Sequence, residues 1–126
     1  MKIVITGGLG HIGSYLLREL PLRLKDLEIT IIDNLITQRY YSLFDLPYLA
    51  KFEFLEANLQ EINLNYILKN SDLVIHLAAI TDAAGSFDNK ERVEANNFSS
   101  TKEIVKACIS TNTKLITLSS TSVYGS

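Results

Sequence analysis

The chain has 126 residues, of which 47% are hydrophobic and 21% charged, and its formal net charge at pH 7 is −2. This size and composition are typical of one globular domain and exclude a disordered, collagen-like or coiled-coil protein. The lack of a basic tract argues against nucleic acid as a partner, and the single cysteine excludes an internal disulfide.

Apolar segments in the sequence are short. None approaches the roughly 20 residues that span a bilayer, and the apolar run at residues 1–6 stops before it reaches the length of a secretory signal. We therefore expect no membrane partner and a cytoplasmic location. No cysteine, histidine or carboxylate pair has the spacing of metal ligands, so no metal site is expected.

Strand-like and helix-like patterns alternate along the chain. Five segments are predicted to be strands: residues 2–6, 28–33, 52–56, 72–77 and 114–119. Their nearly continuous apolar runs are typical of parallel strands that are covered on both faces. With helices between the strands, the pattern predicts an α/β fold with a doubly wound, Rossmann-type parallel sheet in the order 3-2-1-4-5.

Helical periodicity fills the segments between these strands. Residues 11–20 carry apolar side chains four apart, and Pro21 is expected to end or kink that helix. Residues 36–50 are interpreted as a loop with one helical turn, and residues 60–69 as a short helix. The loop aromatics are expected to pack over the sheet edge: Tyr40, Tyr41, Phe44 and Tyr48. The helix before the last strand has one face made of Val93, Asn97, Ser100, Ile104 and Cys108.

Three glycines spaced three apart follow the first predicted strand: Gly7, Gly10 and Gly13. Glycine gives a tight turn its freedom in φ and lets a pyrophosphate approach backbone N–H groups, because no Cβ intervenes. The following helix start adds partial positive charge. The loop therefore predicts a dinucleotide phosphate site, and a plain structural turn is the alternative.

An acidic residue, Asp33, ends the second predicted strand, 20 residues after Gly13. A carboxylate at this position can accept hydrogen bonds from the adenosine ribose and would repel a 2′-phosphate. The next residue is Asn34 rather than arginine, so the sequence favours NAD over NADP as cofactor. A cap at the end of the strand is the alternative role for Asp33.

The chain resembles the extended short-chain dehydrogenase/reductase family. The resemblance is carried by the glycine loop, by Asp33-Asn34, and by three further segments: Asn58-Leu59, His76-Leu77-Ala78-Ala79 and Ser119–Gly125. Within that family they resemble the NAD-dependent sugar-nucleotide epimerase/dehydratase group. At position 58 the family usually has aspartate, whereas this chain has asparagine. The resemblance implies that the following residues lie along NAD: Gly7, Gly10, His11, Ile12, Gly13, Asp33, Asn34, Asn58, Leu59, Leu77, Ala78, Ala79, Thr81 and Asn97.

The resemblance also implies a catalytic residue, Ser120, which lies four residues before Tyr124. Its hydroxyl would hydrogen-bond the sugar oxygen that is oxidised, although Ser119, Thr121 and Ser122 are close alternatives. No carboxylate directly follows Ser120, which favours an epimerase-like or decarboxylase-like member over a 4,6-dehydratase. The resemblance is compatible with a homodimer of the full-length protein.

The acid/base motif of the family, Tyr-x-x-x-Lys, does not occur in the 126 residues. We therefore expect residues 1–126 to be an incomplete NAD-binding domain from an enzyme that acts on a nucleotide sugar, and to be inactive alone. A non-catalytic NAD-binding sensor or interaction module is the alternative. His76 is expected to be a buried histidine with its hydrogen bonds satisfied, and Cys108 a core residue.

Overall fold

The computed structural model describes residues 1–36, 38–78 and 90–118, including all their side chains except those of residues 90–96. It contains one five-stranded sheet with the strand order β3-β2-β1-β4-β5. Every pair of neighbouring strands is parallel. The strands are β1 (Lys2–Thr6), β2 (Leu27–Asp33), β3 (Ala50–Glu56), β4 (Leu73–His76) and β5 (Lys114–Thr117). The predicted fold class and strand order are confirmed.

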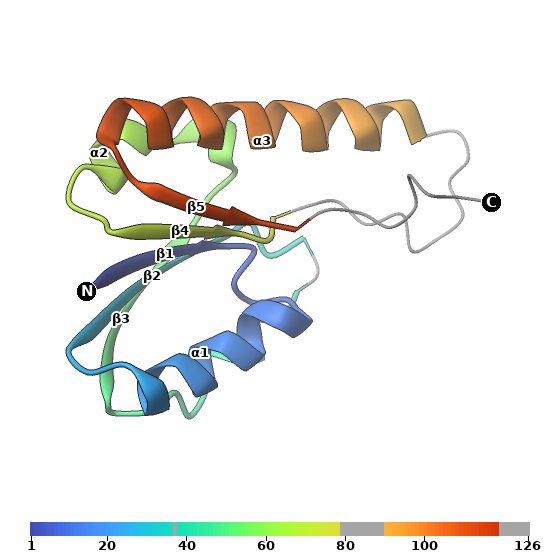
Figure 1. The fold of residues 1–126 in the computed structure, drawn as a ribbon. Coiled ribbons are helices and arrows are strands. Elements are labelled where there is room, and N and C mark those ends of the chain that lie inside the picture. The colour runs from blue at the N-terminus through green and yellow to red at the C-terminus, as the bar shows by residue number, and fades with distance from the viewer. Residues whose placement is uncertain (37, 79–89, 119–126) are drawn as a thin grey trace.

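Helices cover both faces of the sheet (Figure 1). Helix α1 (His11–Arg23) lies on one face, and α2 (Leu64–Leu68) and α3 (Lys90–Thr111) lie on the other. Two short 3-10 helices, η1 (Tyr40–Leu43) and η2 (Leu59–Glu61), follow β2 and β3. This is the doubly wound arrangement that the alternating sequence pattern predicts.

Alternate residues of the strands form two separate cores. On the α1 side, Ile3 and Ile5 of β1 pack in one cluster with Leu17 of α1. On the α3 side, Val4 packs in a second cluster with Ile104 of α3. All five side chains are at most 1% exposed. Burial on both faces explains why the strands read as continuous apolar runs rather than as alternating ones.

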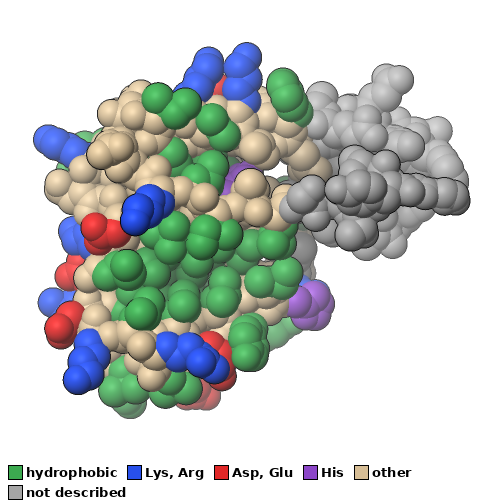
Figure 2. All heavy atoms as spheres, in the orientation of Figure 1, with side chains coloured by type: hydrophobic (Ala, Val, Ile, Leu, Met, Phe, Trp, Pro, Cys, Tyr) green, Lys and Arg blue, Asp and Glu red, His purple; other side chains and the backbone are tan. Residues whose placement is uncertain are grey.

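The α1 side of β5 is less covered. Ile116 pairs with Ile75 in register and is 51% exposed, and Leu118, two residues further on, is 58% exposed. Leu115 points to the opposite side and packs against the α3 core. Figure 2 shows hydrophobic side chains gathered between β5 and α1.

Helix α1 continues through Pro21 to Arg23, so of the two expectations the helix end at Pro21 is wrong, and a kink there stays a prediction. Pro21 lies in the last turn, where its missing N–H removes only the hydrogen bond to the carbonyl of Leu17. The next turn is still closed, because the Leu24 N–H donates to the Leu20 carbonyl at 2.9 Å. The pyrrolidine ring itself is buried.

The aromatic side chains of the loop after β2 lie on the surface, so their expected packing over the sheet edge is wrong. The exposed fractions are 57% for Tyr40, 56% for Tyr41, 61% for Phe44 and essentially all of Tyr48. Leu43 and Leu46 of the loop pack against the α1-side core instead, and polar contacts add to them. The Arg18 guanidinium donates to the carbonyls of Ser42 and Phe44 at 3.1 and 3.0 Å, and the buried Ser42 hydroxyl donates to the Leu9 carbonyl.

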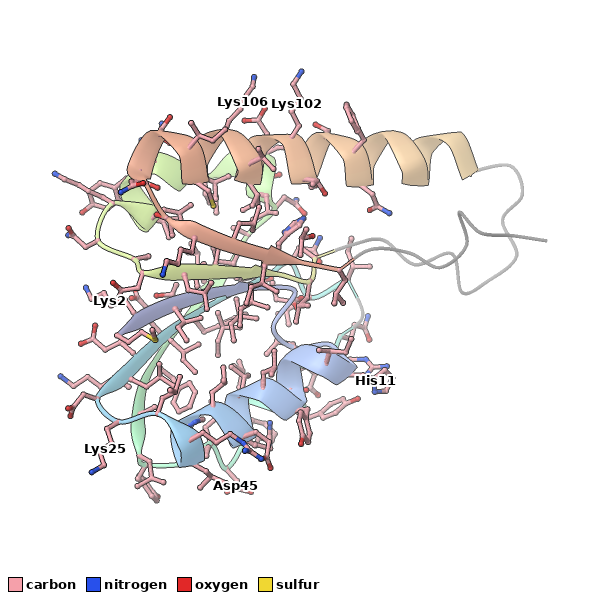
Figure 3. The ribbon with its side chains drawn as sticks, in the orientation of Figure 1. Lys2, His11, Lys25, Asp45, Lys102 and Lys106 are labelled. Carbon is pink, nitrogen blue, oxygen red and sulfur yellow. The ribbon has the colours of Figure 1, made fainter. Side chains whose placement is uncertain are left out.

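The predicted inner face of α3 is confirmed for the side chains that the structure describes. Ile104 and Cys108 are buried, whereas Lys102 and Lys106 point away from the sheet (Figure 3). Cys108 packs in the core as expected, and burial raises the pKa of its thiol. Within the described ranges, no helix is both long and apolar enough to cross a membrane.

Candidate functional site

A cavity of about 440 Å³ lies at the carboxyl ends of the strands. Its lining includes residues at or just after all five strands, and β1 at its centre has β2 and β4 as neighbours. In open α/β sheets, ligands bind at the carboxyl ends of the strands where the strand order reverses, which in this sheet is at β1. Twelve of the fourteen residues expected to lie along NAD line this cavity: Gly7, Gly10, His11, Ile12, Gly13, Asp33, Asn34, Asn58, Leu59, Leu77, Ala78 and Asn97. Ala79, Thr81 and Ser120 lie outside the described residues.

Sequence reasoning missed seven lining residues: Ile32, Ile36, Arg39, Ala57, Gln60, Ser100 and Leu118. Among them, Arg39 brings a positive charge to the cavity, and its Nη2 lies 2.8 Å from Nε2 of His11. Figure 3 shows His11 at the end of the molecule opposite Lys2, where the strands reach their carboxyl ends. Local spacing carries no signal for this contact, because the two residues are 28 positions apart.

The three glycines of the loop after β1 differ in whether the surrounding structure has room for a side chain. Gly7 has a φ of +67°, and a Cβ there would lie 2.7 Å from the backbone nitrogen of Ala78. A Cβ on Gly13 would lie 2.5 Å from the carbonyl oxygen of Gly8. At Gly10 the nearest such atom, the oxygen of Gly7, is 3.5 Å away, which is an ordinary contact. The fold itself therefore requires Gly7 and Gly13 but leaves room for a side chain at Gly10.

The start of α1 presents backbone donors to the cavity. Gly10 is the N-cap and supplies no side-chain cap, and the first helical hydrogen bond is from Ser14 to the Gly10 carbonyl, at 2.8 Å. Among the described residues, the N–H groups of His11, Ile12 and Gly13 have no hydrogen-bond acceptor. All three residues line the cavity. Unpaired N–H groups and the helix dipole together favour an anion at this position.

Asp33 ends β2 and lines the same cavity. Its Oδ2 accepts from the Leu9 N–H at 3.2 Å, and its Oδ1 accepts from the Leu35 N–H at 2.9 Å. The capping role that we considered as an alternative is therefore present. A carboxylate has about four acceptor positions, so each oxygen can still accept a ligand hydroxyl while the two backbone bonds fix its orientation.

Asn34 and Asn58 bring two amide side chains together at the β3 side of the cavity. The Asn34 amide donates to Asn58 Oδ1 at 2.8 Å, and the Asn58 amide donates to Glu61 Oε1 at 3.1 Å. At the other side, Leu77 and Ala78 follow β4, and half-buried Asn97 comes from α3. Within the described residues, no group of three potential metal ligands occurs.

Comparison with known proteins decides the family. Residues 3–126 match the NAD dependent epimerase/dehydratase family. The chain belongs to this family. It is 33% identical over 132 residues to an uncharacterized UDP-glucose epimerase of Bacillus subtilis, covering 99% of this chain and 42% of that protein. It is 34% identical over 130 residues to a dTDP-D-glucose 4,6-dehydratase of Dictyostelium discoideum, covering 99% of this chain and 30% of that protein.

Solved structures of similar proteins share the fold. UDP-N-acetylglucosamine 4-epimerase from Methanobrevibacter ruminantium superposes with a TM-score of 0.85 at 36% identity, over 98% of this chain and 39% of that one. UDP-glucuronic acid 4-epimerase from Bacillus cereus, solved with NAD, gives a TM-score of 0.83 at 30% identity, over 100% and 42%. The chain thus spans less than half the length of these relatives.

In this member of the NAD dependent epimerase/dehydratase family, His76 is 4% exposed and fully hydrogen-bonded, as expected. Its Nδ1 lies 2.7 Å from the hydroxyl of Thr6, and its Nε2 lies 3.3 Å from the hydroxyl of Thr101. The Thr6 hydroxyl also accepts from the Ala78 N–H at 3.2 Å, so the histidine and the loop after β4 share this partner. Burial lowers the pKa of His76, which keeps the ring neutral.

Because His76 is buried and neutral, we expect the folded protein to become less stable as the solution becomes acidic. Because the folded protein holds His76 neutral, the unfolded chain binds that proton first when the pH falls. The free energy of unfolding should therefore decline below about pH 6.5, by up to about 1.4 kcal/mol per pH unit from this one group. Urea unfolding between pH 7.5 and 5.5 measures the slope, which His76→Asn should reduce. An unchanged slope in His76→Asn would contradict the assignment.

Proposed function

We propose that the chain binds NAD along the carboxyl edge of its sheet and forms the cofactor site of an enzyme that acts on a nucleotide sugar. One observation carries the binding proposal. The unpaired N–H groups at the start of α1 and the fixed carboxylate of Asp33 line a single cavity. The first suits a pyrophosphate and the second suits a ribose with free hydroxyls.

The strand order supports a direction for the dinucleotide. Its pyrophosphate would lie against Gly10 and the start of α1, and its adenosine ribose against Asp33 at the end of β2. The adenine would then lie beyond β2, near Asn58 and Leu59, which follow β3. The nicotinamide end would extend the other way, toward Ala78 and β5.

The enzymatic part of the proposal rests on the family and on these cavity residues. NAD, when bound, supplies a hydride acceptor that can later return the hydride. The residues of this chain bind and orient it: backbone donors hold the phosphates, Asp33 holds a ribose, and small residues after β4 leave room beside the cofactor. Ser120 would hydrogen-bond the sugar oxygen that loses its proton. A Tyr-x-x-x-Lys motif in the full-length protein would support the enzyme, and its absence would support a non-catalytic NAD-binding module.

Gly10→Ala tests the cofactor site because the fold has room for its methyl group. The nearest described neighbour of that Cβ is 3.5 Å away, so the loss of stability should be limited to the N-cap preference for glycine over alanine, about 1 kcal/mol or less. The methyl group would, however, stand where the pyrophosphate approaches the backbone, and NAD affinity should fall about fivefold or more. Titration calorimetry with NAD measures the affinity, and thermal unfolding measures the fold. Equal NAD affinity in the two proteins would remove this loop from the site, and no NAD binding by the unmodified chain would overturn the proposal.

A further inference from the structure

The peptide group between Leu9 and Gly10, in the glycine loop after β1, is held by a segment outside that loop. The Leu9 side chain is fully buried, and its backbone is hydrogen-bonded on both sides. The Leu9 N–H donates to Oδ2 of Asp33 at 3.2 Å, and the Leu9 carbonyl accepts from the Ser42 hydroxyl at 3.1 Å. Ser42 is 5% exposed, and neither Leu9 nor Ser42 lines the cavity. The Leu9 carbonyl is therefore directed at a buried hydroxyl behind the cavity wall.

The position of Ser42 is itself fixed by α1. Arg18 Nη2 donates to the Ser42 carbonyl and Arg18 Nη1 to the Ser14 carbonyl, both at 3.1 Å. The Ser14 N–H donates in turn to the Gly10 carbonyl at 2.8 Å. These hydrogen bonds form a closed circuit that leaves the glycine loop along α1 and returns to it through η1. Within this circuit, the Ser42 hydroxyl is the group that ties the loop after β2 to the glycine loop.

Without this hydroxyl, the peptide group between Leu9 and Gly10 has a reason to turn over. A peptide turns over through ψ of its first residue and φ of its second. Gly10 has a φ of −70°, and glycine adopts positive φ about as readily. The turn would break the bond from the Gly10 N–H to the Gly7 carbonyl, which is 3.2 Å long. In exchange, a buried carbonyl that has lost its Ser42 donor would regain one from water.

A peptide turned in this way would oppose an anion in the cavity. Each peptide unit carries a dipole of about 3.5 D, with the negative end at its oxygen. Gly10 lines the cavity together with His11 and Ile12, whose backbone N–H groups suit a pyrophosphate. A carbonyl oxygen turned into that space would place negative charge beside these donors. Held on Ser42, the same oxygen leaves the anion position to N–H groups.

We propose that Ser42 is a positioning residue for the pyrophosphate of the dinucleotide, and that it acts by holding the Leu9 carbonyl away from the phosphates. The inference rests on the proposed NAD site, since it concerns the phosphates of that ligand. It gives the loop after β2 a second role beside the ribose contact of Asp33. Ser42 would act through the backbone of Leu9, because it does not line the cavity itself.

The test compares Ser42→Ala with Ser71→Ala, the same substitution at two serines that donate to backbone carbonyls. The Ser71 hydroxyl donates to the Ile67 carbonyl at 3.3 Å, just before β4 and so at the opposite end of the strands. Titration calorimetry with NAD on the 126-residue chain should show a roughly threefold to tenfold loss of affinity in Ser42→Ala, the range for one hydrogen bond. Ser71→Ala should bind NAD as the unmodified chain does. Equal affinity in Ser42→Ala and the unmodified chain would overturn the inference.

Thermal unfolding establishes that each variant is folded at the temperature of the titration. If Ser42→Ala does not fold, Ser42→Cys takes its place, because a thiol is similar in shape and a weaker donor. The loss of NAD affinity should then be smaller but in the same direction, and an undiminished affinity would again contradict the role of Ser42.

Adenosine separates positioning of the phosphates from general support of the cavity. It can reach Asp33 but has no phosphate to place against α1. In NMR titrations, its affinity for Ser42→Ala should therefore stay within about twofold of its affinity for the unmodified chain. If adenosine and NAD lose affinity to the same extent, Ser42 supports the cavity as a whole and the inference is wrong.

The ¹³C chemical shift of the Leu9 carbonyl reports the hydrogen bond without nucleotide. It should move on Ser42→Ala and not on Ser71→Ala, and an unmoved signal would contradict the inference. The outcomes also separate the inference from the proposed function. If the unmodified chain binds NAD and Ser42→Ala binds it equally well, only the role of Ser42 fails. If the unmodified chain binds no NAD, the NAD site fails and the positioning role fails with it.

Discussion

Replacing Gly13 with alanine should lower the free energy of unfolding by about 2 kcal/mol or more. Helix propensity alone predicts the opposite, since alanine is favoured over glycine inside a helix by about 1 kcal/mol. A close contact of the added methyl group determines whether the free energy of unfolding rises or falls. The new Cβ would lie 2.5 Å from the oxygen and 2.6 Å from the carbonyl carbon of Gly8. Both are backbone atoms, which cannot rotate away, and overpacking of this kind costs about 1 to 3 kcal/mol or more.

Urea unfolding of the two proteins at pH 7.5 measures this change, and Gly10→Ala is its matched control in the same loop. Both substitutions add one methyl group to a glycine that lines the cavity, but the control has a nearest neighbour 3.5 Å away. Gly13→Ala should therefore destabilise the fold by clearly more than Gly10→Ala, which loses only the N-cap preference for glycine, about 1 kcal/mol or less. Equal stability of Gly13→Ala and the unmodified chain would show that α1 can move away from the loop at little cost.

The fold was predictable because its signals are local. Strands buried on both faces give continuous apolar runs, and the glycine loop marks where β1 turns into α1. The strand boundaries differ by one or two residues, as for β3, which begins at Ala50 rather than residue 52. Ile104 and Cys108 were also predictable as core residues, because helical spacing places them on one face.

The failures arise where tertiary contacts override local preference. Pro21 is tolerated inside α1 because only the last turn loses a hydrogen bond and the ring is buried. The loop after β2 is held by Arg18 through backbone carbonyls and by Leu43 and Leu46 against the α1-side core, and its aromatic rings are exposed. The contacts of Arg39 with His11 and of Asn58 with Asn34 join segments 28 and 24 positions apart. No periodicity in a single sequence reports such pairs.

Asp33→Asn should lower NAD affinity by about tenfold to a hundredfold. Hydrogen bonds to a charged group contribute about 1.5 to 3 kcal/mol, and each 1.4 kcal/mol is a factor of ten in affinity. Asparagine keeps the shape of the side chain and one acceptor oxygen. It loses the negative charge and puts a donor where a ribose hydroxyl needs an acceptor. Calorimetric titration of NAD and NADP into both proteins measures the change.

The comparison with NADP separates the two roles that Asp33 has in the structure. Its carboxylate also accepts from the N–H groups of Leu9 and Leu35, so the substitution weakens the loop that holds either dinucleotide. If Asp33 binds the ribose, NAD affinity falls while NADP affinity stays the same or rises, because a 2′-phosphate no longer meets a like charge. If Asp33 only supports the loop, both affinities fall together. Asp72→Asn is the matched control, since Asp72 accepts from the Lys2 N–H at the opposite end of the strands, at 2.8 Å, and should leave both affinities unchanged.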